Sequence, residues 1–220
     1  MSRLSGNELV AKFVVNHGVD EYRIVDISKL SKAENRGLSR AILLVGALPK
    51  EYVHRLREQV DYSIFSETEH RMDHLADELA YRIRKTGYQA ISQSEKSIIE
   101  RQEFYIEEKA TPLPHKKIAV LSGLGWIGKN NLLVTEKYGC ALCMCTLLTD
   151  MPLEVVSEKI QEVQCGNCQA CKKICPAHVI KGTKWTVSTV RDEIVDVYKC
   201  ETCLKCMAYC GFSQKYSRVE

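Results

Sequence analysis

The first 139 residues of this 220-residue chain contain no cysteine, and the chain lacks three further features that would point to particular functions. No apolar run reaches the roughly 18 residues that a membrane-spanning helix requires. No long basic tract is present and the net charge is only +3, so the composition gives no sign of nucleic-acid binding. Residues 1–9 lack the charged-then-apolar order of a secretion signal and contain no twin-arginine motif. We therefore expect a cytoplasmic protein that binds neither a membrane nor DNA.

All eleven cysteines lie between residues 140 and 210. Disulfide scaffolds of high cysteine content are usually short secreted chains, whereas clustered cysteines in a reduced compartment more often bind metal. Hydrophobic residues make up 45% of the sequence and charged residues 27%, which is typical of a globular protein. The length allows one medium domain with a small one appended. We place the division between residues 1–155 and 156–220.

The apolar and capping residues predict a mixture of helices and strands. Ser5 and Glu8 form a capping box that starts the first helix. A second helix is predicted over 67–85, where apolar residues recur at helical spacing, and a third around 153–163. Strands are expected over 22–27, 41–47, 117–121, 131–135 and 141–149. Because the last three strands are joined by short connections, which permit antiparallel pairing but no helical crossover, the expected fold class is α+β.

Eight of the cysteines form two runs with one spacing. Cys165, Cys168, Cys171 and Cys175 follow the pattern C-x2-C-x2-C-x3-C, and Cys200, Cys203, Cys206 and Cys210 repeat it. Bacterial ferredoxins with two [4Fe–4S] clusters show this pattern, and the fourth cysteine of each run ligates the other cluster. We therefore assign Cys165, Cys168, Cys171 and Cys210 to one cluster, and Cys200, Cys203, Cys206 and Cys175 to the other. Zinc sites, which usually combine two C-x2-C pairs across a longer loop, fit these runs poorly.

Three cysteines lie outside the two runs, at Cys140, Cys143 and Cys145. On a strand, Cys143 and Cys145 share one face and Cys140 has the opposite parity. Free cysteine is often a small buried residue of a core strand, and this is the interpretation that we favour. A further metal site, or reactive thiols beside a cofactor, is the alternative.

A glycine-rich loop, Gly123-x-Gly125-x-x-Gly128, precedes the cysteine-rich region. Alone it is a weak signal for dinucleotide binding. Only two residues separate Gly128 from the next apolar run, where a crossover helix would need about a dozen, and no acidic residue follows at the distance of a ribose ligand. The glycines more plausibly allow a tight turn or the close approach of a large flat cofactor. Trp126 could stack on such a ligand or be a core residue.

The motifs from Leu113 onward resemble those of the epoxyqueuosine reductase family and its short relatives that bind two clusters. They include Leu-Pro-His-Lys-Lys-Ile-Ala-Val-Leu, Gly-Leu-Gly-Trp-Ile-Gly-Lys-Asn and Leu-Leu-Thr-Asp-Met-Pro-Leu, followed by the doubled cysteine pattern. The resemblance covers about residues 110–211. It implies a nitroreductase-like core of the cobalamin-binding type, as in reductive dehalogenases, with a ferredoxin-like module packed on it. Electrons would pass through the two clusters to cobalamin.

The resemblance also implies which residues lie near the corrinoid. These are Gly123, Gly125, Trp126, Gly128, Lys129 and Asn130. His115 and Lys116 belong to the Leu-Pro-His-Lys block and are candidates for the same pocket, with His115 a weak candidate for a cobalt ligand.

The sequence departs from the family in two respects. The catalytic aspartate of epoxyqueuosine reductases is expected upstream of the glycine block, where this chain reads Glu-Arg-Gln-Glu-Phe-Tyr over 100–105. Glu103 and Tyr105 are weak substitutes as proton donors. The chain also ends ten residues after Cys210, without the repeat domain that grips tRNA in the family, so tRNA is not expected as a partner.

Three hypotheses for function follow. The first is a cobalamin-dependent reductase or corrinoid-reducing protein. The second is an electron-transfer protein without a corrinoid, whose N-terminal part docks a redox partner. The third, ranked below both, is an iron–sulfur reductase that contains flavin.

Overall fold

The two longest apolar strands of the sequence form the centre of a four-stranded antiparallel sheet. The structure is a computed structural model and describes residues 5–218. Residues 1–4, which belong to the segment 1–9 considered as a secretion signal, and residues 219–220 lie outside the described residues. Strand β2 (Arg40–Ala47) pairs along its whole length with β6 (Leu142–Thr149). Strands β1 (Glu21–Asp26) and β3 (Ala90–Ser92) flank them in the order β1-β2-β6-β3. The strands predicted over 22–27, 41–47 and 141–149 are thus confirmed.

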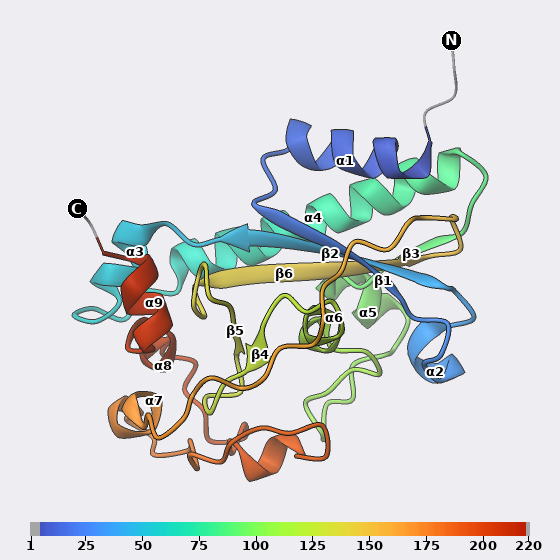
Figure 1. Cartoon of the computed structure of the whole chain (residues 1–220). Helices are drawn as coiled ribbons and strands as arrows, with labels where there is room; N and C mark the ends of the chain where they lie inside the picture. Colours follow the sequence, from blue (N-terminus) through green and yellow to red (C-terminus); the bar gives the residue numbers. More distant parts are fainter. Residues whose placement is uncertain (1–4, 219–220) are drawn as a thin grey trace.

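One face of this sheet is covered by two helices, α1 (Gly6–Asn16) and α4 (Ser63–Lys85) (Figure 1). The capping box of α1 forms as predicted, because the Ser5 amide donates to the Glu8 carboxylate and the Glu8 amide to the Ser5 hydroxyl. Helix α4 buries its apolar stripe as predicted but begins four residues earlier. The reason is Asp61, whose carboxylate accepts hydrogen bonds from both the amide and the hydroxyl of Ser63.

The opposite face carries helix α6 (His115–Leu121) and the hairpin of β4 (Trp126–Ile127) and β5 (Leu133–Val134) (Figure 1). The strand predicted over 117–121 is therefore wrong. Its apolar residues Ile118, Ala119 and Val120 are buried, but they are buried as one side of a short helix that packs on the sheet. An apolar run of this length cannot be distinguished from a buried helix by periodicity. The strand predicted over 131–135 is shorter, with only β5 in its centre.

The segment 153–163 is extended, and the helix predicted there is wrong. Val156 exchanges two backbone hydrogen bonds with Ile24 of β1, at 3.0 and 2.8 Å. The outer edge of β1 would otherwise leave these backbone groups without partners. The pairing carries the chain across the sheet edge toward the cysteine-rich region (Figure 1).

The cysteine-rich region contains only short helices. Leu204, Met207 and Ala208 are buried in the same hydrophobic core as α1 and α4, so the two predicted domains share one core. The remaining elements are α2 (Lys32–Asn35), α3 (Lys50–Arg55), α5 (Glu95–Glu100), α7 (Ala170–Ile174), η1 (Arg191–Glu193), α8 (Lys205–Ala208) and α9 (Gly211–Tyr216). The division at residue 155 stays a prediction. Among the described residues, no helix combines the length and apolar character needed to cross a bilayer.

Candidate functional site

The eight cysteines of the two runs line two separate cavities. Cys165, Cys168, Cys171 and Cys210 line one of about 300 Å³, called here the first cysteine cavity. Cys175, Cys200, Cys203 and Cys206 line the second cysteine cavity, of about 160 Å³. The structure thus brings together the two sets that the spacing assigned, with the fourth cysteine of each run in the other run's cavity. That these sets bind iron stays a prediction, and within residues 5–218 no group of three His, Cys, Asp or Glu residues could hold a metal ion.

Cys210 reaches the first cysteine cavity from the start of α9. Cys210 is the residue directly before that helix. Its sulfur receives hydrogen bonds from the Cys140 thiol and from the backbone amides of Ser213 and Phe212. These hydrogen bonds lower the pKa of Cys210 to about 6. The Cys140 thiol is the donor in this pair, and its own pKa is raised. Burial acts in the opposite direction at Cys206, whose pKa it raises to about 12. These hydrogen bonds therefore favour the thiolate form of Cys210.

Lys129 and Asn130 connect the glycine loop to both cysteine runs. The buried Lys129 ammonium donates to the carbonyl oxygens of Gly166 and Cys168, at 2.7 and 3.0 Å. The Asn130 amide donates to the carbonyl oxygen of Cys206 at 3.3 Å and lies 3.5 Å from the Cys140 sulfur. Asn130 also lines both cysteine cavities. Of the residues predicted near a corrinoid, Gly128, Lys129 and Asn130 therefore line a cysteine cavity, whereas Gly123, Gly125 and Trp126 do not.

The glycines of the loop meet other parts of the chain. A Cβ atom at Gly125 would lie 2.1 Å from the carbonyl oxygen of Val134 across the hairpin, and one at Gly123 would lie 2.5 Å from that of Lys159. Gly128 begins the turn between β4 and β5, with its amide bonded to the carbonyl oxygen of Leu132. Of the two roles considered for these glycines, the structure shows the tight turn with close backbone packing. The glycine motif follows helix α6, whereas the dinucleotide-binding motif follows a strand. The dinucleotide-binding interpretation is therefore excluded.

Trp126 is a core residue. Its side chain has no exposed surface and packs edge-on against Phe212 of α9, with 5.0 Å between ring centroids. It therefore fixes the hairpin against the cysteine-rich region and is not placed to stack on a ligand. Of the two roles considered for Trp126, the structure shows the core residue.

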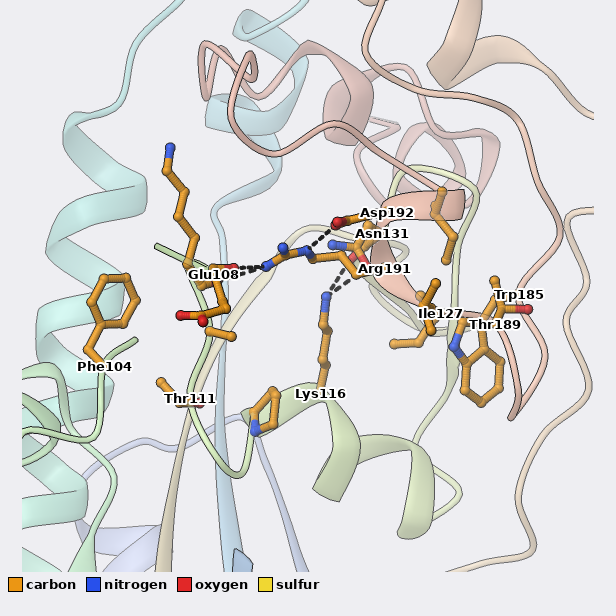
Figure 2. A pocket seen from close by; sticks show the side chains of 15 residues that line it. Phe104, Glu108, Thr111, Lys116, Ile127, Asn131, Trp185, Thr189, Arg191 and Asp192 are labelled. Atoms are coloured by element: carbon orange, nitrogen blue, oxygen red, sulfur yellow. Dashed lines mark hydrogen bonds and ion pairs between the residues drawn. The ribbon is translucent and has the colours of Figure 1, made fainter. Parts of the chain in front are cut away.

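A larger cavity of about 550 Å³ lies between α6 and the cysteine-rich region and is called here the Lys116 cavity. Lys116 points into it and donates to the backbone and side-chain oxygens of Asn131, at 3.1 and 2.8 Å (Figure 2). Burial, together with the nearby charge of Arg191, lowers the pKa of Lys116 to about 8. Asn131 also lines the second cysteine cavity. Asn131 thus lines both cavities.

Arg191 closes the far side of the Lys116 cavity (Figure 2). Its guanidinium donates to the carbonyl oxygens of Glu108 and Lys109, at 2.7 and 2.9 Å, and to the carboxylate of Asp192. These bonds attach the loop before α6 to η1. The indole of Trp185 forms an apolar wall (Figure 2). The sequence analysis missed Arg191 and Trp185, because neither lies in a motif and only the folded chain places them beside Lys116.

The candidate proton donors are not suited to that role. The Glu103 carboxylate accepts hydrogen bonds from Arg36 and Arg101, and these bonds hold its pKa below the usual value despite partial burial. A carboxylate so paired keeps its charge. Tyr105 is about half exposed, and its backbone pairs with Ala110 in the loop.

His115 lies within hydrogen-bond distance of a side chain of the sheet, and Cys143 and Cys145 are buried in the core. His115 begins α6, its Nδ1 lies 3.1 Å from the Thr146 hydroxyl, and burial lowers its pKa to about 4. Cys143 and Cys145 are buried in β6 on the side of α4, and burial raises the pKa of both thiols. This agrees with the favoured interpretation that they are core residues.

Comparison with known sequences extends these observations. No protein-family model matches the chain. An epoxyqueuosine reductase of Pseudomonas aeruginosa is 30% identical over 146 residues, which cover 66% of this chain and 35% of that protein. One of Yersinia pestis is 38% identical over 71 residues, which cover 32% of this chain and 17% of that protein. The chain therefore spans 35% or less of these relatives. The predicted resemblance to epoxyqueuosine reductases is confirmed.

Solved structures share the fold. A catabolic reductive dehalogenase matches 99% of this chain and 34% of its own, with a TM-score of 0.74 and 18% identity. A reductive dehalogenase whose structure suggests a mechanism for B12-dependent dehalogenation matches with a TM-score of 0.68 and 19% identity, over 100% of this chain and 33% of its own. An epoxyqueuosine reductase in complex with a tRNA stem loop matches with a TM-score of 0.59 and 15% identity, over 97% and 66%. The core thus has the fold common to these reductases.

Proposed function

We propose that this chain is an iron–sulfur protein of the reductase type, in which each cysteine cavity holds one [4Fe–4S] cluster. The observation that carries the proposal is the sorting of the cysteines into two complete sets of four around two cavities. When bound, the clusters supply one-electron transfer. The relatives and fold neighbours are reductases, which supports the same class.

The surroundings of the first cysteine cavity suit an anionic group. Lys129, which is 5% exposed, lines this cavity and bonds only to carbonyl oxygens among the described residues. A buried ammonium without a carboxylate partner needs a compensating negative charge. Four cysteine thiolates around a cluster would supply that charge, and the amides at the start of α9 would donate hydrogen bonds to one of them.

The Lys116 cavity is the proposed place where the chain delivers electrons. It shares Asn131 with the second cysteine cavity, and its volume of about 550 Å³ suits a small-molecule site. Lys109, Lys116 and Arg191 line it together with Glu108 and Asp192, so positive side chains exceed negative ones by one, and the Lys116 ammonium, which bonds only to oxygens of Asn131, favours an anionic group such as a phosphate. Cobalamin, whose nucleotide tail carries a phosphate, is the first candidate because it is named for a fold neighbour. A phosphate-bearing flavin has the same anionic chemistry and ranks lower.

Anaerobic purification tests this proposal. About eight irons and eight sulfides per chain are expected from two four-iron clusters. Visible spectra before and after acid removal of the clusters then separate a corrinoid, a flavin and no further chromophore. Zinc without iron would overturn the cluster proposal. Full iron content with no corrinoid, and no corrinoid retained after incubation with cobalamin, would overturn the cofactor proposal alone.

A second candidate function is electron transfer to a protein partner. Two large exposed apolar side chains, Phe104 and Val190, line the Lys116 cavity, and the exposed ring of Tyr198 packs against Lys109 and Arg191 of its lining. Exposed apolar patches mark docking surfaces. This function predicts fast electron exchange with a redox partner and no turnover alone. Phe104→Glu and Val190→Glu should slow that exchange without changing the iron content, and unchanged exchange would argue against docking here.

The complex of a relative with a tRNA stem loop keeps tRNA among the partners to test. The sequence over 100–105, without the aspartate of the family, argues against tRNA as a substrate. A gel-shift titration of the purified chain with unmodified and epoxyqueuosine-containing tRNA separates the two expectations.

A further inference from the structure

A separate cavity of about 590 Å³ lies between α4, α5 and the start of α6 and is called here the acidic cavity. Glu69 and Asp73 reach it from successive turns of α4, and Glu95 from the start of α5. Among the described residues, no lysine or arginine lines it. Phe104 and Thr111 separate it from the Lys116 cavity, and Figure 2 shows both residues. Two neighbouring cavities therefore differ in charge.

The carboxylates of the acidic cavity repel one another. Removal from water and the neighbouring carboxylates raise the pKa of both Glu69 and Asp73. His115 does not compensate, because burial lowers its pKa to about 4 and keeps it neutral. Asp73 accepts hydrogen bonds from the Glu95 amide, at 2.8 Å, and from the Cys145 thiol, and Glu69 accepts one from the Tyr62 hydroxyl. None of these donors carries a positive charge, so the carboxylates still attract a cation.

Gln93 gives an independent indication of a ligand. Its side chain is fully buried and lines the acidic cavity, yet its amide nitrogen and oxygen both lack a hydrogen-bond partner among the described residues. The backbone of Gln93 is fixed, because its amide donates to the carbonyl oxygen of Thr146. A buried side-chain amide without partners destabilises the folded chain. A ligand with both a donor and an acceptor would remove that destabilisation.

The other walls are apolar. Ile98, Phe104 and Met144 line the cavity beside the polar groups. A bare metal ion would leave these apolar walls without contacts. The lining suits an organic molecule with a positive end.

We propose that the acidic cavity binds an organic ammonium ion with an apolar body, its ammonium group beside Glu69 and Asp73 and its polar edge against Gln93. None of these three residues lines the Lys116 cavity or either cysteine cavity.

Three indole compounds of similar shape test which ligand charge the acidic cavity prefers. Tryptamine is cationic, tryptophol is neutral and indole-3-acetate is anionic. Calorimetric titration of the full chain at pH 7.5 and low salt should give tryptamine a Kd at least tenfold below that of tryptophol, with no measurable binding of indole-3-acetate. Equal affinities for all three, or no binding of tryptamine, would overturn the proposal.

Variants then locate the site. Glu69→Gln should weaken tryptamine at least tenfold and leave tryptophol unchanged, whereas Gln93→Leu should weaken both. Glu67→Gln is the matched control, because it removes the same charge from an exposed position of α4 outside the cavity. Far-UV circular dichroism and iron content check that each variant is folded. An equal loss of tryptamine binding in Glu67→Gln would show a general charge effect and contradict the site.

Discussion

The ammonium nitrogen of Lys129 lies 3.0 Å from the carbonyl oxygen of Cys168, in a hydrogen bond that joins the glycine loop to the first cysteine run. The same nitrogen bonds to Gly166. Asn130, the next residue, bonds to Cys206 of the second run. Two consecutive side chains of the hairpin turn thus hold both runs in place.

Lys129→Met should remove the cluster of the first cysteine cavity. The variant loses both bonds to the cysteine loop and the positive charge beside the thiols, so iron should fall from about eight to about four per chain. Lys173→Met is the control, because Lys173 is an exposed residue of α7 in the same region. Iron analysis of anaerobic preparations decides, and full iron content in Lys129→Met would contradict the assigned role.

The crossed pairing of the cysteines predicts which variants look alike. Cys210→Ser should leave the same residual electron paramagnetic resonance spectrum as Cys168→Ser, because both residues line the first cysteine cavity. Cys175→Ser should match Cys203→Ser in the same way. Each variant should keep about four irons. A spectrum of Cys210→Ser that matches Cys203→Ser instead would show uncrossed ligation.

Gly125→Ala should strongly destabilise the chain. Its Cβ would lie 2.1 Å from a backbone oxygen of β5, which cannot rotate away, so the loss should reach about 3 kcal/mol, the upper end of the usual cost of overpacking. Gly87→Ala is the comparison: its φ of +98° is strained for alanine, but its Cβ meets no atom within 4 Å. That loss should stay at about 1–2 kcal/mol. Melting temperatures measured under anaerobic conditions should be lower for Gly125→Ala than for Gly87→Ala. A lower melting temperature for Gly87→Ala would contradict the close packing at Gly125.

Glu69→Gln should raise the melting temperature at pH 7.5. A carboxyl group whose pKa is raised by folding binds more protons in the folded than in the unfolded state between the two pKa values, so stability falls as the pH rises through that interval. Above that pH interval the ionised Glu69 carboxylate destabilises the folded chain to its full extent, and glutamine, which cannot ionise, removes this destabilisation. The gain should shrink as the pH is lowered from 7.5 to 5. Glu67→Gln, outside the cavity, serves as the control, and a gain that does not depend on pH would contradict the raised pKa.

Lys116 should react with amine reagents at unusually low pH. Its pKa of about 8 leaves half of the side chain uncharged at that pH, whereas an ordinary lysine is half uncharged only near about 10.4. Labelling with acetic anhydride, read by peptide mass spectrometry, should therefore give a midpoint near pH 8 in the folded chain. The same peptide labelled in the urea-unfolded chain provides the reference. Equal labelling midpoints in the folded and the unfolded chain would contradict the lowered pKa of Lys116. A ligand bound in the Lys116 cavity should protect the residue.

Local patterns predicted some elements well. The apolar run in β2 and the stripe of α4 were recognised because burial on a sheet or against it imposes a clear period. The short run in α6 was read as a strand, because seven residues cannot separate the two periods. The segment 153–163 was read as a helix, although the free edge of β1 made it extended. Sequence patterns do not report such long-range partners.

The sequence by itself determined the cysteine spacing, and with it the two sets of four that the folded chain gathers around two cavities. Spacing suffices there, because a short loop can direct only certain thiols to one side. The tertiary structure alone decided that the glycine loop packs on its own hairpin, that Trp126 is buried, and that Lys116, Asn131 and Arg191 meet in one cavity. It also placed Glu69, Asp73 and Gln93 together. Gln93 lies about twenty residues from the two carboxylates of α4, and only the packing of α4 against the sheet brings all three to one cavity.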